Sequence, residues 1–133
     1  MLSPVFDQDP TLFILMTPNP ILQLSQICLA LPEAVEAAGV GSPSFTVRKK
    51  IFAMHHPHHG RPSLWLKAPR GFQDAVVAAE PERYFVPPYV GHHGWVGVWL
   101  DIAVDWELIT DWIEESYRMT APKKLIQQLQ TRS

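Results

Sequence analysis

The apolar residues of this 133-residue chain change their spacing near Ser44. Before that point they recur at steps of three and four, the spacing of one helix face, in Ile21, Leu24, Ile27, Cys28 and Leu31. After it, apolar and polar residues alternate over residues 45–47, 50–54 and 64–67, which are rich in β-branched and aromatic side chains. The sequence therefore predicts a helix followed by three antiparallel strands.

Local signals set the ends of the remaining elements. Asn19-Pro20 predicts a helix start, because an amide N-cap precedes a proline whose missing N–H costs nothing there, and Pro32 ends that helix. Helices are also expected over residues 71–79, from an N-cap at Asp105 to Tyr117, and after Pro122, with strands near residues 83–86 and 94–100. This order predicts an α+β fold with helices on one side of an antiparallel sheet.

The length and the 47% apolar content suit one domain, predicted over residues 19–133. Residues 1–18 are interpreted as an N-terminal extension to the domain. Translation could instead begin at Met16, or residues 11–16 could form an ordered edge strand or an arm that packs on a neighbour. The alternation of apolar residues predicts one core that contains Phe45, Ile51, Phe52, Leu64, Leu66, Val96, Val98, Ile109, Trp112, Ile113 and Tyr117.

A cytoplasmic protein is expected. The single cysteine, Cys28, lies in an apolar helical pattern and excludes an intrachain disulfide, which fits a reducing compartment. Asp7 and Asp9 stand where a signal peptide carries positive charge, and no apolar run approaches the roughly 20 residues that span a membrane. No membrane partner is therefore predicted, and the oligomeric state stays open.

The charges are segregated although the net charge is only −2. Residues 37–73 contain no acidic residue and carry a charge of +6, whereas residues 74–115 carry −8 and residues 116–133 carry +4. A local basic surface attracts an anionic partner whatever the net charge. We therefore predict that nucleic-acid phosphates contact a basic β-hairpin surface formed by Arg48, Lys49, Lys50, Arg61, Lys67 and Arg70. The alternative is an ordinary solvated face whose lysines protect a sheet edge.

Arg48-Lys49 is the predicted first turn between strands. A two-residue hairpin turn requires positive φ angles that neither residue favours, so a longer or bulged turn is an alternative. Trp65 alternates with apolar neighbours on the same face as Lys67, where it could stack on a base. A second functional hypothesis is a protein-interaction or small-ligand module with an aromatic pocket made by Trp65, Trp95 and Trp99.

No catalytic residue, metal site or cofactor is predicted. All six histidines lie in two turns, residues 55–59 and 92–93, and no cysteine or carboxylate falls within either turn to complete a metal site. The first turn is expected to have few apolar contacts. The acidic helix after Asp105 is interpreted as a solvated face rather than an iron site, and no nucleophile motif or phosphate-binding loop is present. A non-enzymatic protein is therefore expected.

Several short stretches, taken in order, resemble the MmcQ/YjbR family of small bacterial proteins. They cover roughly residues 19–128 and are Cys28-Leu29-Ala30-Leu31-Pro32-Glu33, Phe45-x-Val47 with Lys50-Ile51-Phe52-Ala53, Leu64-x-Leu66-Lys67, Pro88-Tyr89, Gly94-Trp95-Val96 and Ser116-Tyr117. The resemblance implies a fold similar to the bacterial frataxin CyaY, no established reaction, and a double-wing DNA-binding mode in which two β-hairpins straddle the nucleic acid. Arg48-Lys49 stands where relatives usually have glycines, and the histidines of residues 55–59 are not a family feature.

Overall fold

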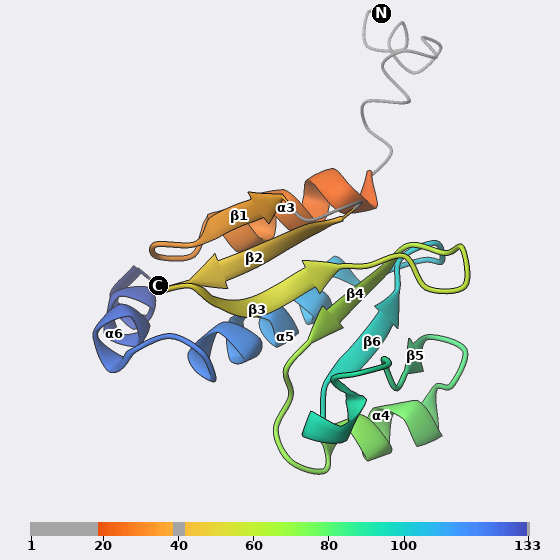
Figure 1. Ribbon diagram of the computed structural model, residues 1–133. Helices are drawn as coiled ribbons and strands as arrows, with labels where there is room; N and C mark the ends of the chain where they lie inside the picture. Colours follow the sequence, from red (N-terminus) through yellow and green to blue (C-terminus); the bar gives the residue numbers. More distant parts are fainter. Residues whose placement is uncertain (1–18, 39–41, 133) are drawn as a thin grey trace, which may run out of the picture.

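A computed structural model describes residues 19–38 and 42–132 of the chain. In chain order the elements are α3 (Pro20–Leu29), β1 (Val35–Ala38), β2 (Pro43–Val47), β3 (Lys50–His55), β4 (Ser63–Leu66), α4 (Phe72–Ala79), β5 (Tyr84–Phe85), the 3₁₀ helix η1 (Gly91–His93), β6 (Val96–Trp99), α5 (Trp106–Arg118) and α6 (Lys123–Arg132). The strands form one antiparallel sheet in the order β1-β2-β3-β4-β6-β5, which confirms the α+β prediction (Figure 1). The predicted N-terminal extension lies outside the described residues.

The two predicted N-caps are confirmed. The side-chain oxygen of Asn19 accepts hydrogen bonds from the backbone N–H groups of Ile21 and Leu22, at 3.0 and 3.3 Å. The carboxylate of Asp105 accepts one from the N–H of Leu108, at 3.2 Å. Each cap satisfies N–H groups that have no partner inside the helix, so these two polar residues fix where α3 and α5 begin.

The predicted strands β2, β3 and β4 form, but β3 contains an irregularity that the alternation did not show. Phe45 pairs with Ala53 and Thr46 pairs with Ile51, so Phe52 is an extra residue that bulges between them. The bulge brings both Phe52 and Ala53 into the core and leaves Ile51 37% exposed. The prediction that Ile51 is a core residue is therefore wrong.

Ser116 of α5 stabilises this bulge from the helix side. Its buried hydroxyl donates to the carbonyl oxygen of Phe52 at 2.5 Å and accepts from the backbone N–H of Lys67 at 3.0 Å. These two backbone groups lie on neighbouring strands, β3 and just after β4, at the same end of the sheet. One side chain thus holds α5 against the sheet and satisfies polar groups that the bulge would otherwise leave unpaired.

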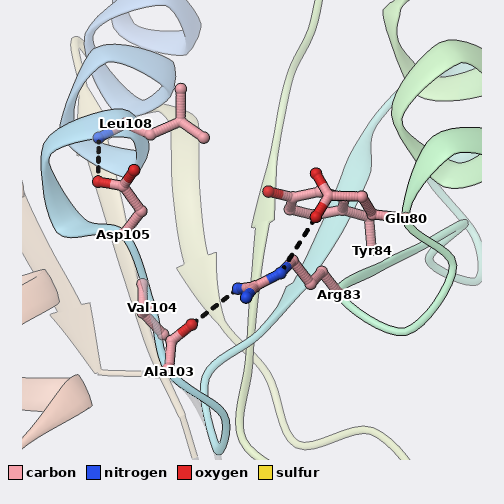
Figure 2. A pocket seen from close by; sticks show the side chains of 7 residues that line it. All are labelled: Glu80, Arg83, Tyr84, Ala103, Val104, Asp105 and Leu108. Atoms are coloured by element: carbon pink, nitrogen blue, oxygen red, sulfur yellow. Dashed lines mark hydrogen bonds and ion pairs between the residues drawn. The ribbon is translucent and has the colours of Figure 1, made fainter.

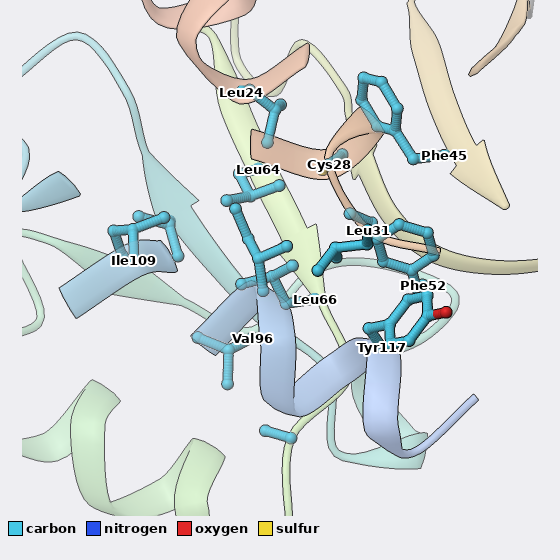
Figure 3. Packing of buried hydrophobic residues seen from close by; sticks show 14 of the residues in the cluster. Leu24, Cys28, Leu31, Phe45, Phe52, Leu64, Leu66, Val96, Ile109 and Tyr117 are labelled. Atoms are coloured by element: carbon cyan, nitrogen blue, oxygen red, sulfur yellow. The ribbon is translucent and has the colours of Figure 1, made fainter. Parts of the chain in front are cut away.

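The core lies between the sheet and the helices that cover one of its faces (Figure 3). Tyr117 is fully buried, its ring meets that of Phe52 edge to face at 5.3 Å, and its hydroxyl donates to the carbonyl oxygen of Pro32 at 2.6 Å. Cys28 is also buried, and burial, followed by the nearby charge of Glu36, raises the pKa of its thiol well above the usual range. The thiol is therefore protonated and unreactive. Within the described ranges, no helix is both long and apolar enough to cross a membrane.

Candidate nucleic-acid interface

The turn between β2 and β3 is the two-residue turn, despite its residue types. Arg48 has a φ of +50° and Lys49 a φ of +69°, the left-handed conformation that hairpin turns require and that costs a residue with a Cβ about 1–2 kcal/mol. The two cations therefore stand at the tip of the hairpin, next to α6 in Figure 1.

Arg48 is not free at this tip. Its Nε and Nη2 atoms donate to the two carboxylate oxygens of Glu33, at 2.7 and 3.2 Å. The hydrogen bond from Arg48 lowers the pKa of Glu33, and the charge of Lys124 in α6 acts in the same direction. The paired guanidinium thus contributes little net charge, and Lys124 places α6 in the same basic neighbourhood.

Arg61 lies at the opposite end of β3, in the turn that leads to β4 (Figure 1). Its guanidinium makes two 2.8 Å hydrogen bonds to the carboxylate of Asp101 and lies 3.8 Å from the centre of the Trp99 ring. This bidentate geometry is the strong form of an arginine–carboxylate pair, and its hydrogen bonds lower the pKa of Asp101. The structure therefore separates Arg61 from the hairpin tip and gives it a partner.

Three of the predicted residues remain together as unpaired cations: Lys49, Lys50 and Lys67. Within the described part of the chain, none of them has an ion-pair partner. Burial lowers the pKa of Lys67, and the like charge of Lys50 lowers it further. The two ammonium groups are thus close enough to repel each other, and a phosphate between them would relieve that repulsion.

Sequence analysis did not include α6 in this surface. Lys123 and Lys124 are exposed in its first turn, and Lys124 lies near the Glu33–Arg48 pair. The charge of +4 over residues 116–133 was the available signal. Its relevance depends on the packing of the last helix beside the first hairpin, which the order of elements does not reveal.

The three tryptophans of the second hypothesis are buried rather than arranged around an open pocket. Trp65, Trp95 and Trp99 are 2%, 8% and 8% exposed. His56 stacks on Trp65 with ring centres 4.3 Å apart, so Trp65 is covered and does not offer a face to a base.

The first histidine turn covers Trp65 and Trp99, and the expectation that it has few apolar contacts is wrong. The ring of His58 lies parallel to that of Phe85 at 4.8 Å and stacks on Trp99 at 5.7 Å. The bulk of aromatic rings on the sheet thus gives the turn a surface to pack on. In the part of the chain that the structure describes, no group of three or more histidine, cysteine or acidic side chains is placed to hold a metal ion.

Arg70 lines an open cavity of about 510 Å³, together with Gln73, His92 and His93. A different open cavity, of about 450 Å³, contains Glu80, Arg83, Tyr84 and Asp105 (Figure 2). Within it, Arg83 pairs with Glu80 at 3.1 Å and donates to the carbonyl oxygen of Ala103 at 2.7 Å. Because its cation is already satisfied and two carboxylates line it, this second cavity does not suit an anion.

The comparisons with known proteins concern the whole fold rather than these side chains. The family model described as YjbR matches residues 29–119. The crystal structure of DR2400 from Deinococcus radiodurans, whose family-model domain is DUF419, is similar with a TM-score of 0.64 and 22% identity, over 74% of this chain and 78% of that one. No curated protein matches the chain. At this identity the solved structure supports the fold and leaves the role of each basic residue to the geometry.

Proposed function

We propose that this chain, which belongs to the YjbR family, is a non-enzymatic nucleic-acid-binding protein. The contact surface is the end of the sheet that carries the unpaired lysines Lys49, Lys50 and Lys67, extended by Lys123 and Lys124 of α6. The observation that carries the proposal is that Lys49, Lys50 and Lys67 have no ion-pair partner among the described residues, while the like charge of Lys50 is near enough to lower the pKa of Lys67. DNA is the polyanion that we propose, in the cytoplasm, where the free thiol of Cys28 also fits.

The β2–β3 hairpin is one wing of the double-wing mode that the family resemblance implies. Lys49 and Lys50 are exposed at its tip, and Lys124 of α6 adds charge near Glu33, the partner of Arg48. Phosphate contacts of this kind position a protein on nucleic acid without reading its sequence. We therefore expect weak binding that depends on salt and is independent of sequence.

The alternative, a small-ligand or protein-interaction module with a pocket made by Trp65, Trp95 and Trp99, has less support. Each of the three side chains is at most 8% exposed, and the histidine turn lies over two of them. A ligand could reach that site only after the turn had left the sheet.

The test is the salt dependence of DNA binding. Fluorescence anisotropy should give an affinity for mixed-sequence duplex DNA that falls with log salt, with a slope of about −0.9 for each neutralised phosphate. The variant Lys49→Ala/Lys50→Ala should reduce the slope by about two units. A matched control, Arg61→Gln/Arg83→Gln, removes two charges that are paired elsewhere and should leave the slope unchanged. Absence of binding by the unmodified protein at about 50 mM salt would refute the proposal.

A further inference from the structure

The cavity that contains Arg70 has walls that are fixed without a ligand. The side-chain amide of Gln73 donates to the carbonyl oxygens of Gly91 and Trp95, at 2.7 and 2.6 Å. These two bonds tie the beginning of α4 to both ends of the segment that contains η1. A ligand would therefore enter a preformed space of about 510 Å³, within the size range of small-molecule sites.

The cavity is lined by groups that suit a phosphate. Arg70 is exposed and makes no ion pair among the described residues, and the rings of His92 and His93, which also line the cavity, lie 3.9 Å apart. Asp74 is the one carboxylate in the lining. Arg70 supplies a fixed cation and the two imidazoles supply hydrogen-bond donors, a set of groups that can bind a phosphate.

A strained turn presents an aromatic side chain just before this wall. Tyr89 is 84% exposed and has a φ of +69°, and the N–H of Val90 donates to the carbonyl oxygen of Pro88 at 2.7 Å. This is the geometry of a γ-turn with positive φ, which is rare and strained. Such strain persists only when the surrounding structure imposes it, and it is concentrated at functional sites. Here the strained residue is a tyrosine that solvent reaches almost completely.

The cavity adjoins the basic surface along the chain, and the tyrosine adjoins the cavity. Ala68, which lines the cavity, directly follows Lys67, and Tyr89 comes two residues before Gly91, which lines it as well. A strand whose phosphates contact Lys50 and Lys67 can therefore continue towards Arg70.

We propose that this cavity and Tyr89 bind one unpaired nucleotide of a single strand, with its base stacked on Tyr89 and its phosphate beside Arg70, His92 and His93. This inference rests on the proposed function and makes it more specific: the protein binds single-stranded nucleic acid more tightly than duplex. A stacked base supplies affinity whatever its identity, because every base has a π-face. In a duplex the base is already stacked and cannot reach the tyrosine.

The experiment compares a mixed-sequence single strand with its duplex at about 50 mM salt. Tyr89→Ala should weaken single-strand binding about 10-fold and leave duplex binding unchanged, and Arg70→Ala should also weaken the single strand preferentially. Tyr89→Phe, which keeps the ring, should restore the affinity. Lys49→Ala/Lys50→Ala should weaken both forms of DNA, which separates the hairpin from the cavity. Because Tyr89 and Arg70 are exposed, these variants should retain the fold.

The outcomes distinguish the inference from the proposed function. If the lysine variant weakens binding but Tyr89→Ala and Arg70→Ala do not, the inference is wrong and the proposed function stands. If neither DNA binds, the proposed function fails, and titration with adenosine 5′-monophosphate decides the inference by NMR of the His92 and His93 ring signals. Saturable shifts that Arg70→Ala abolishes would support the cavity as a nucleotide site, whereas unchanged signals would refute it.

Discussion

The two faces of the sheet are covered in different ways. Helices cover one face, where the buried side chains are mainly aliphatic (Figure 3). On that face the hydroxyls of Ser116 and Tyr117 donate to backbone carbonyls. Over β4, β6 and β5 the other face is covered by the turn after His55, whose rings lie on Trp65, Trp99 and Phe85. The helix face thus depends on filled volume, whereas the outer face depends on the stacking of a few flat rings.

This contrast shows why the two consecutive turns of the chain differ. The Arg48–Lys49 turn leaves both of its residues exposed, whereas the histidine turn stacks a ring on Trp65 of the sheet. Charged tips stay available to a partner, and aromatic turns become part of the structure. The largest losses of stability should therefore come from truncating buried side chains on the helix face. The dependence of stability on pH should come from the histidines that are covered.

The largest effect is expected from the helix face. Ile113→Ala removes a fully buried side chain of α5 and should lower the free energy of unfolding by about 2–5 kcal/mol. Chemical denaturation measures this change. Leu108→Ala is the matched control on the same helix, because Leu108 is 36% exposed and should lose much less. Equal losses at the two positions would show that the helix face is not the main source of stability.

The outer face should be sensitive to added volume. A Cβ at Gly97 would overlap the Phe85 ring. Gly97→Ala should therefore lower the free energy of unfolding by about 1–3 kcal/mol, measured by the same denaturation. Phe85→Leu should relieve part of this cost, because it removes the ring that the new methyl group strikes. If the double variant shows the sum of the two single losses, the ring does not pack on Gly97 and the stacked arrangement is wrong.

Much of this fold follows from sequence, because local signals decide most elements. The caps Asn19 and Asp105 and the alternation in β2 and β4 appear as the patterns predict. Two features depend on distant contacts instead. Strand β1 is short and contains Glu36 and alanines, which have low strand propensity, and it forms because β2 pairs with it. The bulge at Phe52 is stabilised by Ser116, 64 residues away.

The sequence predicted which basic residues the candidate site contains, but it did not predict which of them form ion pairs. An acid-free stretch indicated six cations, but Glu33 and Asp101 lie outside that stretch and reach Arg48 and Arg61 across 15 and 40 residues. A count of charges along the sequence cannot show such pairs. Nor does any sequence pattern show that Tyr89 takes a positive φ, since positive φ angles are uncommon for residues other than glycine.

Tyr89 is 84% exposed, so a substitution there tests backbone strain with little change in packing. Tyr89→Gly should raise the free energy of unfolding by about 1 kcal/mol at most, because glycine adopts positive φ without steric cost but loses more entropy on folding. Thermal unfolding would detect this as a small rise in Tm. Tyr89→Ala keeps the strain and serves as the control. A lower Tm for the glycine variant would mean that the tyrosine side chain itself stabilises the turn.

The smallest effect should appear in the dependence of stability on pH, and it separates the two faces. Burial lowers the pKa of His58, and the neighbouring His59 and His56 lower it further, while Arg61 stacks beside it on Trp99 and is paired with Asp101. Burial also lowers the pKa of His55, which pairs across the sheet with Leu64 on the helix face.

A histidine whose pKa is lowered in the folded protein binds its proton more readily when the chain is unfolded. Stability from both groups should therefore be complete above pH 6.5, the ordinary histidine value, and fall as the pH drops below it towards the folded pKa. His58→Phe keeps a flat ring on Phe85 and Trp99 but cannot be protonated, so it should lose less stability between about pH 7 and pH 5 than the unmodified protein. His55→Phe measures the part of the remaining loss that comes from the helix face. Identical pH profiles for the unmodified protein and His58→Phe, measured by urea denaturation, would mean that the outer face does not lower the pKa of His58 and does not hold it in its neutral form.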